Sequence, residues 1–469
     1  MSATRDSAAA LMSRSARMIS GILLIALAAG ILTGAALVAF QDHGAQHAIR
    51  QAVKTQQDSE TAGTGRWPKK TGQVCGLLAA SLVFIQFVLS SKLKTLDRVF
   101  GLHRLLYFHQ CLGLSLVIMA TLHPLFMFAP PDASIGPFRP TIWPKLLGML
   151  LLIGLWTGVS AARWRRFLGM DYQNWYRFHR LGMFGAVVIL TLHFWNVNRD
   201  FHRGWPLYGL GACLFIYGAL FLWIVALKPG LLRRRAYTVT KVQRSSRDTH
   251  SVELSPAKGE VFLYAPGQFA FVTFLSELLP VERHHWTISS APTRAESCTL
   301  TIKCSGDFTA LLGRLRAGDR ASIDGPYGRF THLAGARDSG RNLIMIAGGI
   351  GITPMFSMLR YMVDTGDDRK VTLVWSNRTE DDILCREELE EIQRKLPNFT
   401  AHHVLTRSKN SQAGGGRLNG AKLEELLSGC DREAAVFVCG PPAMMQDVCD
   451  SLKELGFNAA SIHTEKFSY

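Results

Sequence analysis

Two apolar stretches of the chain each carry two histidines at the same spacing. His109 and His123 flank one stretch, and His179 and His193 flank another. A step of fourteen residues turns an α-helix through about 1400°, close to four full turns, and rises about 21 Å. The two histidines of each stretch would therefore lie on one face of their helix, with one histidine toward either side of a hydrocarbon core about 30 Å thick.

Axial ligation of iron is the chemistry that suits these side chains, because neutral imidazole is a good iron ligand. If the two helices run in the same direction, His109 lies level with His179, and His123 lies level with His193. An isolated membrane histidine is also compatible with packing, but ionisable groups in hydrocarbon are costly and usually functional. The matched spacing predicts two bis-histidine b-type haems, bound non-covalently because the chain has no CxxCH sequence.

Apolar segments of bilayer-spanning length must carry these histidines. About 20 residues of helix cross a hydrocarbon core, and 48% of the 469 residues are hydrophobic. The first segment could also be a signal peptide, but its apolar part exceeds the usual cleavable core of about 7 to 15 residues. We therefore expect it to be retained. The six predicted membrane helices span residues 18–40, 72–91, 104–128, 143–162, 178–197 and 205–227.

Basic residues are concentrated before the first of these segments and after the second, fourth and sixth. By the positive-inside rule this bias places both termini in the cytoplasm of a multi-pass protein of the inner (plasma) membrane, although the first outer loop also carries basic residues. The two histidine-bearing helices would then run in the same direction. Much of the net charge of +16 lies at these flanks and favours anionic lipid, so no nucleic-acid partner is expected.

Short β-branched runs replace the apolar segments after residue 235. Six runs bounded by Gly and Pro, between residues 237 and 328, predict an antiparallel barrel or sandwich. Three strand-turn-helix units follow and predict a parallel sheet that binds ligands at the carboxyl ends of its strands. In the first unit, Gly348, Gly349 and Gly351 would let a pyrophosphate approach a helix N-terminus, although Pro354 replaces the last glycine of the usual fingerprint.

The motifs HHWTISSAP, IKCSGDFTALL, GPYG, AGGIGITP, VCGPPAMM and EKFSY occur in an order that resembles the ferredoxin-NADP reductase superfamily over residues 236–469. Joined to a haem-binding membrane domain, the chain resembles the ferric reductase and NADPH oxidase superfamily. The resemblance implies a multidomain membrane protein. Its expected parts are a cytoplasmic segment (1–17), an all-α six-helix transmembrane haem domain (18–228), an antiparallel β-barrel FAD-binding domain (236–335) and an α/β Rossmann-like NAD(P)H-binding domain (340–469).

The same resemblance places FAD on the strand that contains HHWTISS. Trp286 would stack on FAD, and Thr287 would lie near the reactive edge of the flavin. His284 would face the FAD diphosphate and share this anion with the adjacent Arg283. The other FAD-binding residues that the resemblance implies are Ser289, Ser290, Gly306, Asp307, Phe308 and Thr309.

For the nicotinamide nucleotide, the resemblance places Cys439 beside the nicotinamide and Phe467 over the flavin, so that Thr287, Cys439 and Phe467 surround the hydride transfer. Cys439 needs no nucleophilic role there. Arg378 follows the second strand, where a cation would pair with the 2′-phosphate of NADPH, which favours NADPH over NADH despite the nearby Glu380 and Asp381. The other residues implied are Gly349, Gly351, Ile352, Thr353, Gly440 and Pro441.

These expectations define a transmembrane oxidoreductase. A hydride carries two electrons and a haem iron accepts one, so FAD is the required converter between NADPH and the two haems. The external acceptor could be O2, giving superoxide, or a ferric iron chelate, and Arg199, His202 and Arg203 in the last outer loop fit either. The alternative is a haem-bearing membrane subunit that passes electrons to a partner protein. Because the chain has no EF-hand or proline-rich segment, no obligatory protein partner is expected.

Overall fold

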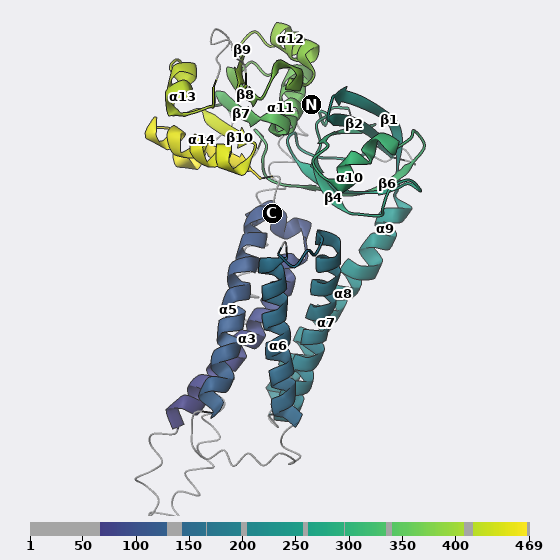
Figure 1. Ribbon diagram of the computed structural model, residues 1–469, viewed down its shortest axis with the longest axis vertical. Coiled ribbons are helices and arrows are strands. Elements are labelled where there is room, and N and C mark those ends of the chain that lie inside the picture. Colours follow the sequence, from purple (N-terminus) through teal and green to yellow (C-terminus); the bar gives the residue numbers. More distant parts are fainter. Residues whose placement is uncertain are drawn as a thin grey trace, which may run out of the picture. The chain divides into compact units, whose positions relative to one another are not determined.

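The computed structural model describes residues 66–128, 143–165, 167–197, 204–256, 261–294, 296–333, 340–407 and 416–466. The chain divides into two compact units, and the boundary falls between Ala226 and Leu227. The first unit consists of long helices, and the second contains the two sheets (Figure 1).

Within the described residues, five helices are long and apolar enough to cross a membrane. The first expected membrane segment, 18–40, lies outside the described residues, so five of the six expected segments are observed. The short helix α4 (Lys94–Phe100) follows the first of them. The five are α3 (Arg66–Ser90), α5 (Leu102–Phe128), α6 (Trp143–Trp164), α7 (Tyr172–Val197) and α8 (Gly204–Leu222), which continues through a π-helical turn (Trp223–Leu227) into α9 (Lys228–Arg234).

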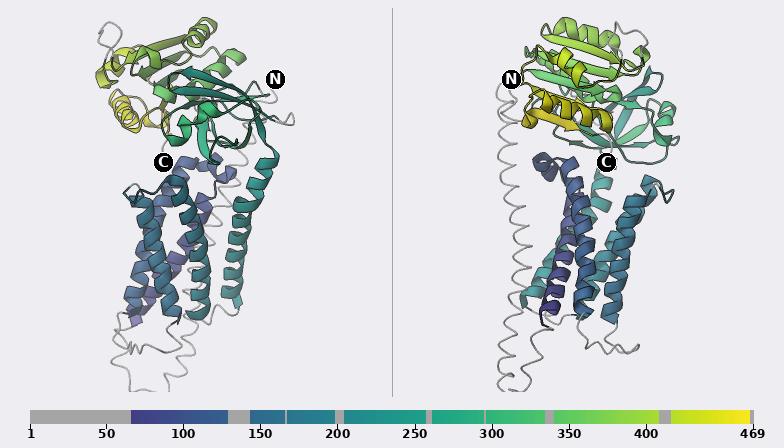
Figure 2. Two further views of the ribbon diagram at one scale, coloured as in Figure 1. Left: turned by 45° about the vertical axis from the view of Figure 1, so that its right-hand side comes forward. Right: turned by 60° about the vertical axis from the view of Figure 1, so that its left-hand side comes forward.

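Alanine, valine and leucine side chains, together with Tyr217, form the buried core of the helical unit. Ala79 and Val83 of α3 pack in one cluster with Val117 of α5 and Val187 of α7. Large apolar side chains such as Phe215 lie exposed on the outside of the bundle, where lipid would cover them. Helices α5, α6 and α7 run side by side in every view (Figures 1 and 2). The helical unit therefore has a narrow interior and an apolar exterior, as a bundle in a bilayer requires.

The second unit begins with a six-stranded antiparallel sheet in the order β4-β3-β6-β1-β2-β5. Its two edge strands approach each other through an isolated bridge between Ile288 and Leu300. The expected antiparallel sheet is thus confirmed, whereas a closed barrel is not. The strands are β1 (Tyr237–Ser246), β2 (Thr249–Pro256), β3 (Phe269–Leu275), β4 (His284–Thr287), β5 (Cys298–Lys303) and β6 (Arg320–Tyr327), and α10 (Asp307–Ala310) follows β5.

A five-stranded sheet in the order β11-β10-β7-β8-β9 follows, and its strands pair in parallel. Ala347 of β7 lies level with Trp375 and Cys439, so the carboxyl ends of three strands share one edge. The strands are β7 (Leu343–Gly348), β8 (Val371–Asn377), β9 (Phe399–Leu405), β10 (Ala435–Cys439) and β11 (Ile462–Glu465). The expected parallel sheet is therefore present, with β9 and β11 as strands that the sequence patterns did not indicate.

Helices cover both faces of the parallel sheet, because its central strands are apolar on both sides. Met345 of β7 packs in the cluster with α11 (Thr353–Thr365) and α12 (Arg386–Lys395). The next residue, Ile346, packs in the cluster with α13 (Gly420–Leu427) and α14 (Pro442–Glu454). The alternation of side chains along one strand thus builds two separate cores.

Candidate functional site

The helical unit brings the four histidines together in the two pairs that their spacing predicted. The ring centroids of His109 and His179 lie 6.1 Å apart, and those of His123 and His193 lie 6.3 Å apart. The rings within each pair are nearly perpendicular, at 84° and 88°. Each pair takes one residue from α5 and one from α7, so two equivalent sites lie along the same pair of helices.

The separation of the rings matches the size of a metal ion between them. An imidazole nitrogen bonds a metal at about 2 Å, so two rings on opposite sides of one ion have centres about 6 Å apart. Both measured separations agree with this value. The residues present therefore fit bis-histidine ligation at both pairs.

Backbone carbonyls fix the tautomer of three of the four rings. Nδ1 of His123 lies 2.7 Å from the carbonyl oxygen of Gly72, and Nδ1 of His193 lies 2.7 Å from that of Pro144. A carbonyl oxygen only accepts, so Nδ1 must carry the proton and Nε2 keeps its lone pair. Nδ1 of His109 donates to the carbonyl of Gln86 at 3.1 Å in the same way. A metal-ligating histidine usually donates its other ring N–H to such a group, which fixes the tautomer and the orientation of the ring.

Glycines on neighbouring helices make room for the rings of His123 and His193. A Cβ on Gly76 of α3 would lie 2.7 Å from Nδ1 of His123. A Cβ on Gly148 of α6 would lie 2.9 Å from Cε1 of His193. Both distances are shorter than any ordinary carbon contact, which is about 3.5 to 4.0 Å. The two glycines therefore allow the helices to press directly against the imidazoles.

Gln86 of α3 is a polar residue beside the first pair that the sequence analysis did not identify. Nε2 of Gln86 donates to the backbone carbonyl of His109 at 2.8 Å, and the backbone carbonyl of Gln86 accepts from Nδ1 of the His109 ring. Oε1 of Gln86 is buried and has no hydrogen-bond partner among the described residues. The available signal was an amide side chain deep inside a mainly apolar stretch.

The remaining ring, His179, lies against an aromatic neighbour one helical turn earlier. The ring of Trp175 is nearly parallel to it, with centroids 5.3 Å apart and an angle of 19°. The guanidinium of Arg165 lies 5.8 Å from the centre of the same indole. Trp175 and Arg165 are thus further residues at this pair that histidine spacing alone did not reveal.

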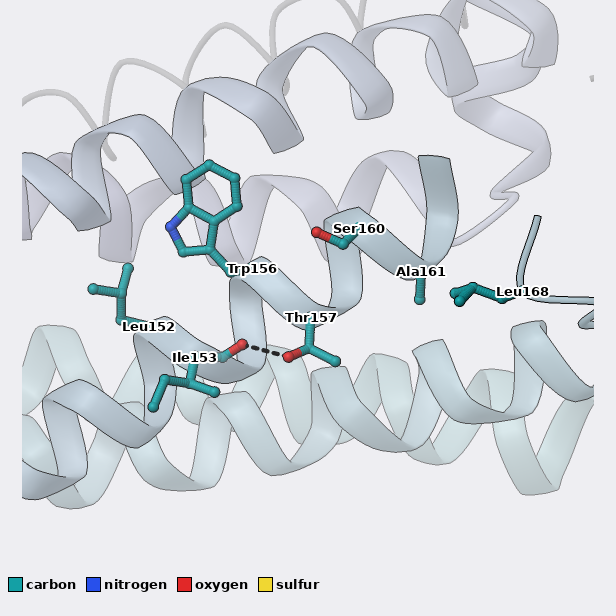
Figure 3. A pocket seen from close by; sticks show the side chains of 7 residues that line it. All are labelled: Leu152, Ile153, Trp156, Thr157, Ser160, Ala161 and Leu168. Carbon is teal, nitrogen blue, oxygen red and sulfur yellow. Dashed lines mark hydrogen bonds between the residues drawn. The ribbon is translucent and has the colours of Figure 1, made fainter. Parts of the chain in front are cut away.

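A cavity of about 460 Å³ lies along α6 in the same unit (Figure 3). Trp156 at its wall donates from Nε1 to Oγ1 of Thr121 on α5 at 3.1 Å. Thr157 satisfies its hydroxyl within the helix by donating to the carbonyl of Ile153. The lining contains none of the four histidines, so this cavity is separate from their sites; it consists of Leu152, Ile153, Trp156, Thr157, Ser160, Ala161 and Leu168.

In the antiparallel sheet, the two segments assigned to FAD lie together. The ring of His284 on β4 stacks on that of Phe308 in α10, with centroids 4.1 Å apart and an angle of 29°. Trp286 continues the stack at 5.4 Å from His284. Thr309 closes the turn before α10, because its Oγ1 accepts from the backbone N–H of Gly306 at 3.0 Å. The segment from Gly306 to Thr309 therefore packs beside His284 and Trp286.

The charges around His284 differ from the simple pattern of two adjacent cations. Burial lowers the pKa of His284 even though Glu282 lies 2.9 Å from its Nε2, so the ring is neutral at pH 7. Arg283 is bound to the buried carboxylate of Asp324, which also accepts from Lys228 at 2.8 Å. Arg283 therefore does not offer an uncompensated charge. Two cations share one carboxylate here, so Lys228, Arg283 and Asp324 together carry one positive charge, which the carboxylate of Glu282 beside His284 opposes.

The hydroxyl residues at the end of β4 are buried and hydrogen-bonded to other strands. Oγ of Ser289 lies 2.9 Å from Oγ1 of Thr301. Oγ of Ser290 lies 2.8 Å from the hydroxyl of Tyr264 and also accepts from the backbone of Thr299. Thr287 is buried as well. These contacts fix the backbone beyond Trp286, while the flavin-contacting roles of these residues remain predictions.

The glycine-rich turn after β7 packs directly on the end of β10. A Cβ on Gly351 would lie 2.2 Å from the carbonyl oxygen of Cys439, so only glycine fits. Gly349 adopts a left-handed conformation with φ of +53°, and its carbonyl accepts from Nε1 of the buried Trp375 at 3.0 Å. The strand order reverses between β7 and β10, which is where open parallel sheets bind nucleotides. Gly440 and Pro441 continue this edge beside the glycine turn.

The helix α11 starts at the glycine turn. Thr353 at its beginning is buried and donates from Oγ1 to the carbonyl of Ile350 at 3.0 Å, and Ile352 is buried beside it. Pro354 lies in the first turn of the helix, where backbone N–H groups have no partner within the helix, so the missing N–H of proline costs no hydrogen bond. The substitution of the usual last glycine by proline is therefore compatible with this helix start.

The other residues assigned to the nucleotide lie in three different settings. Arg378 directly follows β8 and is exposed. Cys439 is fully buried, and burial together with the charge of Glu465 raises the pKa of its thiol well above its ordinary range. It therefore stays protonated and is unsuited to nucleophilic chemistry. Phe467 lies outside the described residues.

Three domain families match consecutive parts of the chain. The family described as "Ferric reductase like transmembrane component" matches residues 75–190. The family described as "FAD-binding domain" matches residues 234–331, and "Oxidoreductase NAD-binding domain" matches residues 345–450. The first range contains three of the four histidines, and the other two contain the stacked aromatic residues and the glycine turn.

Curated relatives match a smaller part of the chain. The glycine betaine monooxygenase reductase subunit of Chromohalobacter salexigens is 32% identical over 213 residues, which cover 44% of this chain and 57% of the relative. NADH-cytochrome b5 reductase 1 of Dictyostelium discoideum is 32% identical over 161 residues, which cover 34% of this chain and 55% of the relative. The chain thus spans little more than half the length of these relatives. A solved structure, the Amycolatopsis cytochrome P450 reductase GcoB, is 27% identical with a TM-score of 0.45 over 50% of this chain and 69% of that one.

Proposed function

Because this chain belongs to the ferric reductase and NADPH oxidase superfamily, as its three consecutive domain matches establish, we propose that it moves electrons from NADPH across a membrane. The proposed path runs from NADPH through FAD and two b-type haems to an acceptor on the other side. The observation that carries this proposal is the pair of histidine sites with ring separations of 6.1 and 6.3 Å. The acceptor is O2, giving superoxide, or a ferric iron chelate.

Four histidines would hold the two haems. His109 and His179 would bind the inner haem, and His123 and His193 would bind the outer one. Support comes from Nδ1 protons that are engaged by backbone carbonyls in three rings, which directs Nε2 toward the metal. With two histidines on each iron, neither metal would have an open position, so an acceptor would receive electrons at the edge of the outer macrocycle.

The residues of the antiparallel sheet would hold FAD. Trp286 and the stacked rings of His284 and Phe308 offer a flat apolar surface, while Thr287, Ser289 and Ser290 shape the strand beside it. His284 would lie beside the phosphate with its one N–H engaged by Glu282, and the net positive charge of Lys228, Arg283 and Asp324 would attract the phosphate. Gly306 and Thr309 would complete the phosphate side through backbone N–H groups.

The glycine turn and the end of β10 would hold NADPH. Gly349, Gly351, Ile352 and Thr353 would face the diphosphate at the start of α11. Arg378 would pair with the 2′-phosphate, and Cys439, Gly440 and Pro441 would lie beside the nicotinamide, with Phe467 over the flavin. When bound, FAD would accept two electrons as a hydride and release them singly to the haem irons.

The basic residues that flank the helices favour an inner (plasma) membrane with both termini in the cytoplasm. In this orientation His109 and His179 would lie toward the cytoplasm, on the same side as the NADPH site. His123 and His193 would lie toward the outside, where the acceptor is reduced. Lipid and the small-molecule substrates would then be the partners of the chain.

Anaerobic reduction of the haems by NADPH tests the proposal. The detergent-solubilised chain is supplied with FAD, and its haem absorption bands are followed after NADPH is added. We expect both haems to become reduced, while unchanged bands in a chain with bound FAD and haem contradict the proposal. Oxygen or ferric citrate, added separately with and without superoxide dismutase, then identifies the acceptor.

A second function is favoured by the relatives that are reductase subunits of monooxygenases. In this alternative, the chain is a haem-bearing membrane subunit that passes electrons to a partner protein. Its haems would be reduced by NADPH as before, but neither O2 nor ferric citrate would reoxidise them rapidly. Slow reoxidation by both small acceptors therefore separates the two functions.

A further inference from the structure

Three side chains on one face of α11 hold the segment that follows β4. Ser357 donates from Oγ to the carbonyl of Ser290 at 2.6 Å, and Arg360 donates from Nη1 to the carbonyl of Ser289 at 2.6 Å. One turn further along the helix, Asp364 accepts from the hydroxyl of Thr293. The spacing of three and four residues places the three on the same side of the helix. The antiparallel and parallel sheets are thus joined by a row of hydrogen bonds.

Arg360 is the strongest member of this row, because a carboxylate orients it. Its Nε and Nη2 bind the two oxygens of Glu388 on α12 at 2.6 and 2.7 Å. Such a bidentate pair holds the planar guanidinium in one orientation. Nη1 is thereby left to donate to Ser289, so Glu388 determines where the carbonyl of Ser289 lies. A lysine has neither the planar fork nor the second and third donors in fixed directions.

The contact between the two sheets leaves little room for adjustment. A Cβ on Gly267, just before β3, would lie 2.2 Å from the carbonyl of Phe330 and 2.6 Å from Cε of Met358 in α11. Gly267 also has a positive φ of +89°, which favours glycine. The end of the Met358 side chain in α11 therefore lies against the turn before β3. With the hydrogen bonds of Ser357 and Arg360, this contact forms the joint between α11 and the antiparallel sheet.

This joint connects the two halves of the proposed hydride-transfer site. Ser289 and Ser290 follow Trp286 and Thr287, which would bear the flavin, with only Ile288 between them. At its other end, α11 begins at Thr353 beside the glycine turn. From Thr353 to Arg360 a helix rises about 10 Å. This part of α11 therefore links the strand proposed to bear the flavin to the glycine turn proposed to bind the nucleotide.

We propose that Arg360, oriented by Glu388, is a positioning residue for hydride transfer from the nicotinamide to FAD. This inference rests on the proposed function, since it assumes that both groups bind where the domain matches place them. Arg360 would touch neither group. Its effect would be indirect, because a displacement of about 1 Å at reacting atoms can slow a reaction about 100-fold.

Arg360→Lys tests the inference in the full-length, detergent-solubilised chain loaded with FAD. Stopped-flow absorbance measures the rate of FAD reduction per bound FAD at rising NADPH concentrations, under anaerobic conditions. We expect the limiting rate to fall about tenfold or more, while the half-saturating NADPH concentration changes less than about threefold because its binding residues are untouched. Ser357→Ala, which removes the neighbouring hydrogen bond, should lower the same rate by a smaller factor.

Arg341→Lys is the matched control. Arg341 donates to Oγ of Ser461 at 2.8 Å and pairs with Glu433 at 3.5 Å, so it also makes one hydrogen bond and one ion pair. It lies two residues before β7, at the amino end of the parallel sheet. We expect its limiting rate to equal that of the parent chain. Hydrogen exchange supplies a readout besides activity: the backbone amides of residues 289–291 and of Thr293 should exchange faster in Arg360→Lys than in Arg341→Lys.

Each outcome decides the inference. Equal limiting rates in Arg360→Lys and the parent overturn it, as does a lower FAD content with an unchanged rate per bound FAD. Faster exchange without a slower rate shows a purely structural joint and also overturns it. If NADPH does not reduce FAD even in the parent chain, the proposed function itself fails and the positioning role falls with it. These failures are distinguished by the behaviour of the parent.

Discussion

Replacement of Gly148 by alanine should remove the outer haem without unfolding the helical unit. The added Cβ would lie 2.9 Å from Cε1 and 3.3 Å from Nδ1 of His193. The ring cannot swing freely, because its Nδ1 is held 2.7 Å from the carbonyl of Pro144. The imidazole or the helix must therefore move to restore an ordinary contact.

The required movement can be compared with what metal ligation tolerates. A normal carbon contact begins near 3.5 Å, so the ring must shift by about 0.6 Å. Metal–ligand distances vary by only about 0.2 Å in well-formed sites. Overpacking of this kind opposes folding by about 1 to 3 kcal/mol, against about 1 kcal/mol gained when glycine becomes alanine in a helix. The net change in stability is small, while the geometry of the ligand is lost.

The assay is the ratio of haem to protein in purified chains, measured as the pyridine haemochrome, with a redox titration of what remains. The parent should hold two haems and Gly148→Ala should hold one. Gly154→Ala is the matched control, because it lies on the same helix about 240° around the axis and its Cβ would meet nothing within 4 Å. If Gly148→Ala keeps two haems with unchanged potentials, the proposed seat of His193 is wrong.

Three further predictions follow from residues of the second unit. Arg378→Ala should raise the KM for NADPH about tenfold or more and leave that for NADH unchanged, because a charge-assisted bond contributes about 1.5 to 3 kcal/mol; equal changes for both nucleotides would contradict the phosphate pairing. Burial lowers the pKa of His332 to about 3 from its ordinary value of 6.5. The neutral buried ring therefore contributes stability above pH 6.5, and this stability is lost as the pH falls toward 3. Each unit of pKa difference corresponds to about 1.4 kcal/mol. His332→Leu should therefore shift acid unfolding, followed by tryptophan fluorescence, to lower pH, and an unshifted or higher midpoint would oppose this. Cys439 should resist iodoacetamide at pH 8 in the folded chain and react after denaturation, because burial keeps its thiol protonated; mass spectrometry of alkylated peptides checks this, and native labelling would contradict it.

The histidine pairs could be predicted because helical geometry depends only on spacing. Four turns separate His109 from His123, and the same holds on α7, so each helix carries its two histidines on one face. The shared direction of the two helices, which the basic flanks predicted, then set which histidines lie level. The supports of these rings could not be predicted in this way. The carbonyls of Gly72 and Pro144 lie 51 and 49 residues away in the chain from the rings they contact, and a backbone carbonyl carries no sequence signal.

In the second unit, strands were recognisable where alternation or a glycine turn marked them, as at β7 with its glycine turn. Strand patterns did not show whether the sheet closes into a barrel, because closure depends on how the edge strands β4 and β5 pair with each other. Charge compensation was also hidden. Asp324 lies 41 residues from Arg283 in the chain, so the sequence carried no signal for this ion pair.

The central claim is that both histidine pairs carry electrons that originate from NADPH. The most direct test is an anaerobic haem spectrum of the purified chain with FAD, recorded before and after NADPH is added, together with the haem content. The account predicts two haems per chain, both reduced by NADPH. A single haem per chain, or two haems that stay oxidised beside bound FAD, would contradict it.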